Sequence, residues 1–402
     1  LILVYLVIFL ITMSKGTINV IFPPFLEARA YIISQIGLLS SLFAVFQLAA
    51  RLPAGVLYTP QRARLILSGG LLVLGTTALG FTAFEPVALL AAMIVLNGFA
   101  FGVITTVALA LSIDAKPADY PSGAMMGWYT SAIAAGYAVG QPVGGFLADR
   151  YGFFAAFGGT AVFSLLAILI ISSLPGLGQT ASQAGTEPAR RRGSRSRWGL
   201  RFDPRQIPSG VLLATLIVFF VNLMFRSLHT FFPLYALAVG LSLTQIGFLR
   251  SMLSLSAAAV RPFSGKLFQV IPYRRVTHLA MAAGAGAVVL SPAMTGSMAL
   301  LVVLFVLMGL SRGLARVTSA TMLAESSDRT EGHWVGVWSG VYNAGLDLGS
   351  IAGPAFGGYL ASLLGIPRML TVVPALALGT YAVVSLTARR KRLKAAATVA
   401  VD

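Results

Sequence analysis

The chain has 402 residues, of which 57% are hydrophobic and only 10% charged, and its mean hydropathy is +0.85. Soluble domains are closer to about 25% charged, so this composition excludes a soluble enzyme, a disordered regulator and a nucleic-acid reader. The formal net charge of +17 does not indicate nucleic acid, because most basic residues lie in short loops between apolar runs. There is no cysteine, and His229, His278 and His333 are too scattered to predict a metal site.

Twelve apolar runs are long enough to cross a bilayer as helices, since one span needs about 20 residues. In chain order they cover residues 2–25, 34–57, 65–84, 87–113, 122–146, 153–174, 209–233, 243–265, 276–293, 298–323, 334–360 and 368–387. The runs lack the alternation of transmembrane strands. The sequence therefore predicts an all-α membrane protein.

The expected organisation is two six-helix bundles, at 1–174 and 209–388, followed by a basic tail at 389–402. A basic linker at 175–208 joins them, and its glycines, serines and seven arginines indicate a flexible tether. Lysine and arginine concentrate on the side of the N-terminus, so the positive-inside rule places both termini in the cytoplasm. We expect a multi-pass protein of a bacterial or archaeal-type inner (plasma) membrane.

The two halves repeat each other at a distance of about 210 residues. The matched segments are SQIGLLSSLF at 34–43 with TQIGFLRSML at 244–253, Arg51 with Arg261, Gly55 with Gly265, and Tyr129 with Tyr342. Such a repeat predicts two parallel halves around an axis along the membrane normal. Transporters use this plan, and their substrate site lies between the halves.

Small residues recur four positions apart in the fifth and eleventh runs. They are Gly136, Gly140, Pro142, Gly144 and Gly145 in the fifth run and Gly349, Gly353, Pro354, Gly357 and Gly358 in the eleventh. Small residues at this spacing let two helix backbones approach closely within lipid. We expect these residues to allow close helix packing and to take part in the conformational changes of the protein.

With its twelve spans, its repeat of six helices, its basic middle loop and GPAFGG at 353–358, the whole chain resembles the Major Facilitator Superfamily. The resemblance implies alternating access around a central cavity lined by spans 1, 4, 7 and 10. It also implies a conformational latch in the loops that begin at Gly55 and Gly265. Both loops depart from the family pattern, because Thr59 and Gln269 replace its usual Asp. Drug:proton antiporters of the family often carry an Arg in span 4. This chain has Ile94 at that position, which weakens its resemblance to those antiporters.

Charged residues within predicted spans are the strongest functional signal, since each costs at least about 2.5–3.5 kcal/mol to insert. Arg51, Arg250 and Arg261 lie nearer span ends, where snorkelling or helix-end contacts are the simpler interpretation. Lys15, Arg226, Arg312 and Arg316 lie deeper and are candidate substrate-binding residues. Arg312 and Arg316 form a like-charge pair at i,i+4, which an anion in a wet cavity would stabilise. Organic-anion exchangers of the resembled family carry cations in spans 1 and 7. Salt bridges and backbone contacts are the competing explanation.

Four further side chains are candidates. His229 follows Arg226 by three positions and titrates near neutral pH when free, although packing alone is the alternative. Tyr129 and Tyr342 could stack on a substrate. Asp347 has two competing roles, since it could carry a coupled proton or pair with an arginine.

These features predict a secondary active transporter of small organic solutes, coupled to H+ and favouring anions in its central cavity. The chain contains no Walker A pattern, so ATP hydrolysis is not expected. We expect no enzyme activity, no cofactor, no metal and no nucleic-acid partner; the partners are the solute, the coupling ion and the bilayer. Two alternatives remain. One is a broad drug or metabolite exporter, a proton antiporter without anion preference, and the other is a non-transporting receptor or scaffold on the same fold.

Overall fold

The computed structural model describes residues 2–84, 86–115, 122–173, 207–327 and 335–399. In these residues every regular element is a helix. The helices are α1 (Ile2–Ala28), α2 (Ile33–Leu57), α3 (Pro60–Ala83), α4 (Val87–Asp114), α5 (Ser122–Ser173), α7 (Ser209–Ala238), α8 (Leu243–Val270), α9 (Tyr273–Leu290), α10 (Met298–Ser327), α11 (Val335–Leu364) and α12 (Ile366–Val399).

α5 is two helices in one, because Gly152 breaks it with φ 83° and ψ 172°. That backbone region is essentially restricted to glycine. With the two arms counted separately, the described residues hold the predicted twelve helices, and the prediction of an all-α membrane fold is confirmed. α12 differs from expectation, since it continues as helix to Val399 through most of the predicted tail.

Nine of the described helices are long and apolar enough to cross a membrane on their own. α9 and α11 are not among them. α9 has only 18 residues and includes Arg274, Arg275 and His278. α11 is rich in glycine and contains Asn343 and Asp347. One of these two less apolar helices, α11, faces the central cavity, where polar side chains can contact water or a solute.

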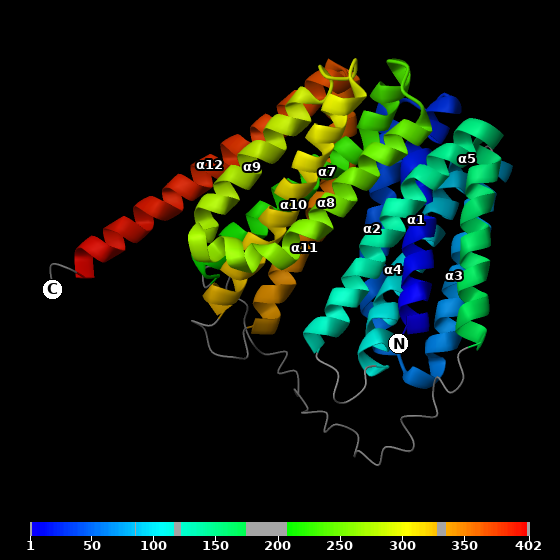
Figure 1. Cartoon of the computed structure of the whole chain (residues 1–402), viewed down its shortest axis with the longest axis horizontal. Coiled ribbons are helices and arrows are strands. Elements are labelled where there is room, and N and C mark those ends of the chain that lie inside the picture. Colours follow the sequence, from blue (N-terminus) through cyan, green and yellow to red (C-terminus); the bar gives the residue numbers. More distant parts are fainter. Residues whose placement is uncertain (1, 85, 116–121, 174–206, 328–334, 400–402) are drawn as a thin grey trace, which may run out of the picture.

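Each half is built in the same way. α1 packs along the first arm of α5, and α7 packs along α11 in the other half (Figure 1). Thr17 donates to the Gly140 carbonyl (2.9 Å) and Ser227 donates to the Gly353 carbonyl (2.7 Å), so the repeat extends to single hydrogen bonds. The backbones meet closely here because a Cβ on Gly140 or Gly353 would overlap the facing helix. The expected packing role of the glycine motifs is thereby given a structural basis.

The backbones of the two halves pack closely towards one end. We call the end at which α1 begins and α5 ends the near end, and the opposite one the far end (Figure 1). The main apolar core joins both halves towards the far end, where Phe25 and Ile36 belong to the same cluster as Phe231. A separate core, which includes Ile8, Leu67 and other residues of α1, α3, α4 and α5, fills the near end of the first half.

Glycines seal the far end. Gly37 of α2 lies against Pro354 and Gly358 of α11, and its repeat partner Gly247 of α8 lies against the backbone of Gln141 and Pro142 of α5. These contacts cross from one half to the other at symmetric places. No side chain fits between the backbones, so these contacts close the space between the halves at the far end.

Gly55 and Gly265 do not share this role, although the sequence groups them with the other motif glycines. A Cβ at either position would meet nothing within 4 Å. Both lie near the near-end tips of α2 and α8, where the two halves are apart. Close backbone packing is therefore not the role of these two residues in this conformation, and the conformational latch that the resemblance implies for their loops stays a prediction.

Candidate functional site

A cavity of about 380 Å³ lies between the two halves. α1, α2 and α5 of the first half and α7, α8, α10 and α11 of the second supply its walls. Glycine contacts close it from the far end, while Arg51 and Asn343 on its walls remain exposed. This location and size suit a small solute.

Positions that match in the repeat form much of this wall. The matched lining pairs are Thr130 with Asn343, Ala134 with Asp347, Tyr137 with Ser350, Asn19 with His229, Ala44 with Ser254, Gln47 with Ala257 and Arg51 with Arg261. The two halves therefore line the cavity with residues at equivalent positions of the repeat. The chemistry of the wall is not symmetric, because the second half carries most of the charge.

Six arginines and one aspartate line the cavity. Five of the arginines, Arg226, Arg250, Arg261, Arg312 and Arg316, belong to the second half, and Arg51 belongs to the first. Among the described residues, only Arg51 has a carboxylate within ion-pair distance. The other five guanidinium groups therefore create a positive potential in the space between the halves.

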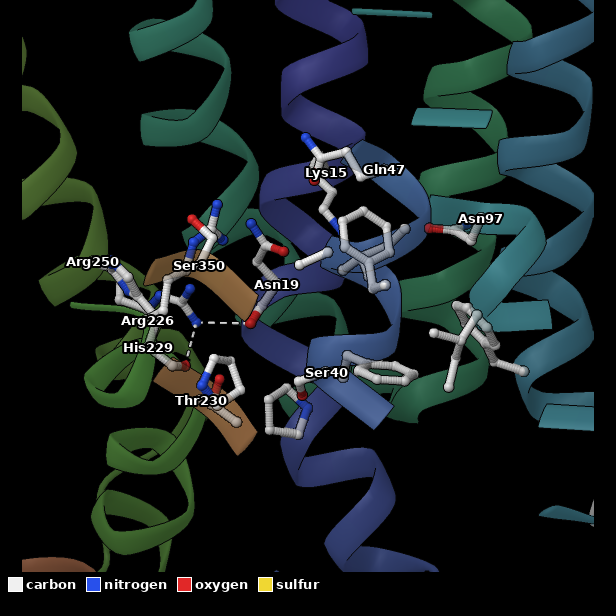
Figure 2. A pocket seen from close by; sticks show the side chains of 18 residues that line it. Lys15, Asn19, Ser40, Gln47, Asn97, Arg226, His229, Thr230, Arg250 and Ser350 are labelled. Carbon is white, nitrogen blue, oxygen red and sulfur yellow. Dashed lines mark hydrogen bonds between the residues drawn. The ribbon is translucent and has the colours of Figure 1, made fainter. Parts of the chain in front are cut away.

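Arg226 and Arg250 lie with the His229 imidazole where the main cavity and a smaller side cavity share their walls. Arg250 is 3% exposed, and its Nη1 donates to the Asn19 carbonyl (2.8 Å) across the halves and to the His229 carbonyl (3.4 Å) (Figure 2). Arg226 Nε, His229 Nδ1 and Arg250 Nε are buried and find no hydrogen-bond partner among the described residues. Such groups are costly unless a water or ligand satisfies them.

Arg312 and Arg316 of α10 both reach the same cavity, as their spacing of one helical turn predicts. Arg312 Nη1 lies 3.5 Å from His229 Nε2 and its guanidinium carbon lies 5.6 Å from the Phe225 ring centroid. A cation–π contact of this kind offsets only part of the cost of a buried charge. Arg226, Arg312, Arg316 and His229 are therefore brought together as the sequence suggests.

Asp347 pairs with Arg51 across the two halves. Arg51 Nη1 lies 2.9 Å from Oδ2 and 3.0 Å from Oδ1 of Asp347. Both side chains line the cavity. Of the two roles that the sequence leaves open for Asp347, pairing with an arginine is the one that the geometry displays.

Lys15 lies apart from the arginines. Its ammonium nitrogen lies 3.2 Å from the centroid of the Phe43 ring and 5.4 Å from that of Phe101, and the side chain is 5% exposed. Lys15 lines a smaller side cavity but not the main one (Figure 2). The true repeat partner of Arg226 is Gly16, so Lys15 is turned by about 100° around the helix, towards α2 and α4.

Tyr129 and Tyr342, which the sequence predicts to stack on a substrate, are not among the residues that line either cavity. Tyr129 is 9% exposed and belongs to the near-end core of the first half. Tyr342 is 8% exposed, and its hydroxyl lies 3.0 Å from the Ser319 hydroxyl. Both rings pack inside their own half.

Tyr137 and Arg250 line the cavity, but the sequence does not predict them as substrate-binding residues. Tyr137 lies eight positions after Tyr129 on α5, and Arg250 lies near a span end, where snorkelling is the simpler interpretation. For Tyr137, the sequence repeat is the signal that could have predicted its place in the cavity. Tyr137 and Ser350 directly follow Gly136 and Gly349, and a residue next to a glycine that packs against α1 or α7 faces the cavity.

Among the described residues, no group of three or more His, Asp or Glu side chains could hold a metal ion. No arrangement of a nucleophile and a base lines the main cavity either, since its lining contains one carboxylate, paired with an arginine, and one histidine surrounded by arginines. The groups that this wall offers to a ligand are mainly guanidinium hydrogen-bond donors.

Known proteins resemble the chain in sequence and in structure. The sequence profile of the Major Facilitator Superfamily matches residues 4–338 and 215–400. The uncharacterised MFS-type transporter MJ1560 of Methanocaldococcus jannaschii is 23% identical over 335 residues, which cover 83% of this chain and 84% of that protein.

Two solved structures share the fold at low sequence identity. The nucleoside transporter NupG has a TM-score of 0.75 at 12% identity, over 96% of this chain and 97% of NupG. A bacterial homolog of the human lysosomal transporter Spinster, inward-facing and occupied, has a TM-score of 0.71 at 15% identity, over 96% of each chain. The protein is a transporter rather than an enzyme, and the chain belongs to the Major Facilitator Superfamily.

Proposed function

We propose that this protein is a secondary active transporter that carries small organic anions by alternating access. The observation that supports the proposal is the group of five cavity arginines without a carboxylate partner among the described residues. Each such charge costs at least about 2.5–3.5 kcal/mol within a membrane. An anionic substrate that receives charge-assisted hydrogen bonds from several of them offsets this cost.

Transport also requires an energy source, and we propose H+ with Asp347 as its carrier. The carboxylate is held by Arg51 of the opposite half, so binding of a proton removes the ion pair and frees the two halves to move at this level. Protonation of one cavity residue would in this way bias the equilibrium between the two conformations.

The charge distribution supports an orientation with both termini in the cytoplasm. In that orientation the sealed far end faces outward, and the cavity opens towards the cytoplasm. The described conformation would then be the one that takes up or releases substrate on the cytoplasmic side. Exchange between the two faces requires the far-end glycine contacts to separate.

Counterflow in vesicles tests the proposal. Purified protein is reconstituted with an internal pool of unlabelled organic anions, and uptake of the labelled anion is followed with and without an imposed pH gradient. We expect saturable counterflow that cationic dyes do not inhibit, and accumulation that depends on the gradient. Efflux of cationic dyes without anion counterflow would instead support the broad drug exporter. Binding without any flux would support a receptor.

A further inference from the structure

A second, smaller cavity opens from the main one. It measures about 80 Å³ and shares Arg226, His229 and Arg250 with the main cavity. From this cationic wall it extends into the first half, between α1, α2, α3 and α4. Figure 2 shows the two sides, with Arg226, Arg250 and His229 together on one and Asn97 on the other.

Apolar side chains form more than half of the lining of this side cavity in the first half. Phe22 and Phe81 lie with their ring centroids 5.2 Å apart, and Phe43 and Ile94 complete the wall. Phe22, Phe81 and Ile94 are all below 10% exposed and belong to the main core. An apolar wall of this kind binds an alkyl or aromatic group and gains nothing from a charge.

Polar side chains also border the side cavity, and those of the first half are Lys15, Asn19, Ser40, Gln47 and Asn97. The Lys15 ammonium faces the rings of Phe43 and Phe101. Asn97 donates to Thr77 Oγ1 (2.8 Å), and only its Oδ1 lacks a partner among the described residues. The guanidinium groups lie on the second-half side of the cavity, and the aromatic rings lie on the first-half side.

We infer that the substrate is an organic monoanion with a short apolar group, an inference that rests on the function proposed above. The charged group binds among Arg226, Arg250 and Arg312 in the second half. The apolar group enters the side cavity between Phe22, Phe43 and Ile94 in the first half. A single molecule thus contacts both halves, which is what a transporter needs if substrate is to promote their movement.

The volume of the side cavity sets the size of the apolar group. A dry cavity of about 150 Å³ holds benzene. Some 80 Å³ is about half of that volume, so the side cavity accepts an aliphatic group of about three or four carbons. Each methylene that enters it is expected to raise affinity about fourfold, which corresponds to about 0.8 kcal/mol.

Binding of straight-chain monocarboxylates from acetate to octanoate to the purified full chain tests the inference by titration calorimetry. We expect affinity to rise about fourfold per added methylene up to pentanoate and then to level off. Equal affinity along the series would overturn the inference and leave the proposed function standing. Tighter binding of a dicarboxylate than of the monocarboxylate of equal length would also overturn it, because the preferred substrate would then carry a second charge in place of the apolar group. Absence of binding to any carboxylate would overturn both.

A variant that fills the side cavity provides a second measurement. Ser40 lines the side cavity but not the main one, so Ser40→Leu occupies the space that the alkyl group needs. The ratio of pentanoate to acetate affinity should fall at least tenfold. Ser362→Leu makes the same chemical change at an exposed position of α11 and should leave that ratio unchanged. A ratio that stays high in Ser40→Leu would contradict the inference, and Ala44→Leu repeats the measurement if Ser40→Leu fails to fold.

Discussion

Arg51 of α2 and Asp347 of α11 are 296 residues apart in the chain, yet one guanidinium nitrogen of Arg51 lies 2.9–3.0 Å from both carboxylate oxygens of Asp347. They form the one ion pair that joins two described residues, and each half supplies one partner. The far-end contacts beyond them are made by glycine backbones and by the Asp149 carboxylate, which accepts hydrogen bonds from the start of α8. Asp347 is the carboxylate that lines the main cavity, and its protonation would remove the ion pair there, as the proposed coupling requires.

The first prediction concerns proton coupling at this pair. Asp347→Asn should abolish accumulation driven by a pH gradient, because no proton can then be bound or released there. Counterflow, which needs no net proton movement, should continue. Uptake into reconstituted vesicles with and without the gradient measures both quantities.

Arg51→Gln is the matched control for this prediction. It removes the ion pair but keeps the carboxylate, so some response to the gradient should remain even where the rate falls. Gradient-driven accumulation that survives in Asp347→Asn would show that Asp347 has only a structural role. The same loss of response in both variants would point to the ion pair itself rather than to the proton.

The second prediction separates function from stability at Arg226. Arg226→Gln should weaken anion binding at least about tenfold, since a hydrogen bond to a charged group contributes about 1.5–3 kcal/mol. The same change should raise the melting temperature in the absence of substrate, because it removes a buried cation that has no acid partner among the described residues. Titration calorimetry and thermal unfolding in detergent give the two values.

Arg368→Gln serves as the control for charge alone. Arg368 is exposed at the start of α12 and lines neither cavity. Its substitution should alter neither affinity nor melting temperature. If Arg226→Gln bound anions as tightly as the unaltered protein, the cationic wall would not be the binding site.

The fold could be predicted from the sequence because bilayer thickness fixes helix length and the repeat fixes the symmetry. The charged wall could also be predicted, since arginines within a membrane span, such as Arg312, are rare unless they have a function. The direction in which each side chain points could not be predicted from the sequence. Lys15 differs by one position from the repeat partner of Arg226, and that single step turns it from the centre towards Phe43. Tyr129 was misplaced for a related reason, because repeat matching does not tell a cavity face from a core face.

The third prediction concerns the far-end seal. A Cβ on Gly145 would overlap the backbone of Leu243, which begins α8 in the opposite half. Gly145→Ala should therefore weaken the closed far end. The chain has no cysteine, so Ser254→Cys in the main cavity provides a single labelling site. Labelling by a membrane-impermeant thiol reagent added on the far side should increase.

Gly55→Ala provides the comparison, because a Cβ at Gly55 meets nothing within 4 Å. This variant should show the labelling rate of the Ser254→Cys protein without further change. Equal labelling of Gly145→Ala and Gly55→Ala from the far side would mean that backbone contact at Gly145 does not hold the halves together.

The fourth prediction concerns Asp149, which caps a helix of the opposite half. Its carboxylate accepts from the backbone N–H groups of Leu243 (3.1 Å) and Thr244 (2.7 Å) and from the Thr244 hydroxyl (2.6 Å), at the first turn of α8. An N-terminal cap contributes about 1 kcal/mol, and the negative charge adds to it through the helix dipole. This cap exists only while the far end is closed, so it favours that conformation.

Asp149→Ala should therefore shift the equilibrium about fivefold towards opening of the far end, as about 1 kcal/mol implies. The measurement is again labelling of Ser254→Cys from the far side. Asp149→Asn keeps a side-chain acceptor for the N–H groups of α8, because asparagine caps helices nearly as well as aspartate. It should restore most of the protection, whereas loss of protection in Asp149→Asn to the level of Asp149→Ala would assign the effect to charge rather than to capping. Unchanged labelling in Asp149→Ala would show that the glycine contacts alone keep the far end closed.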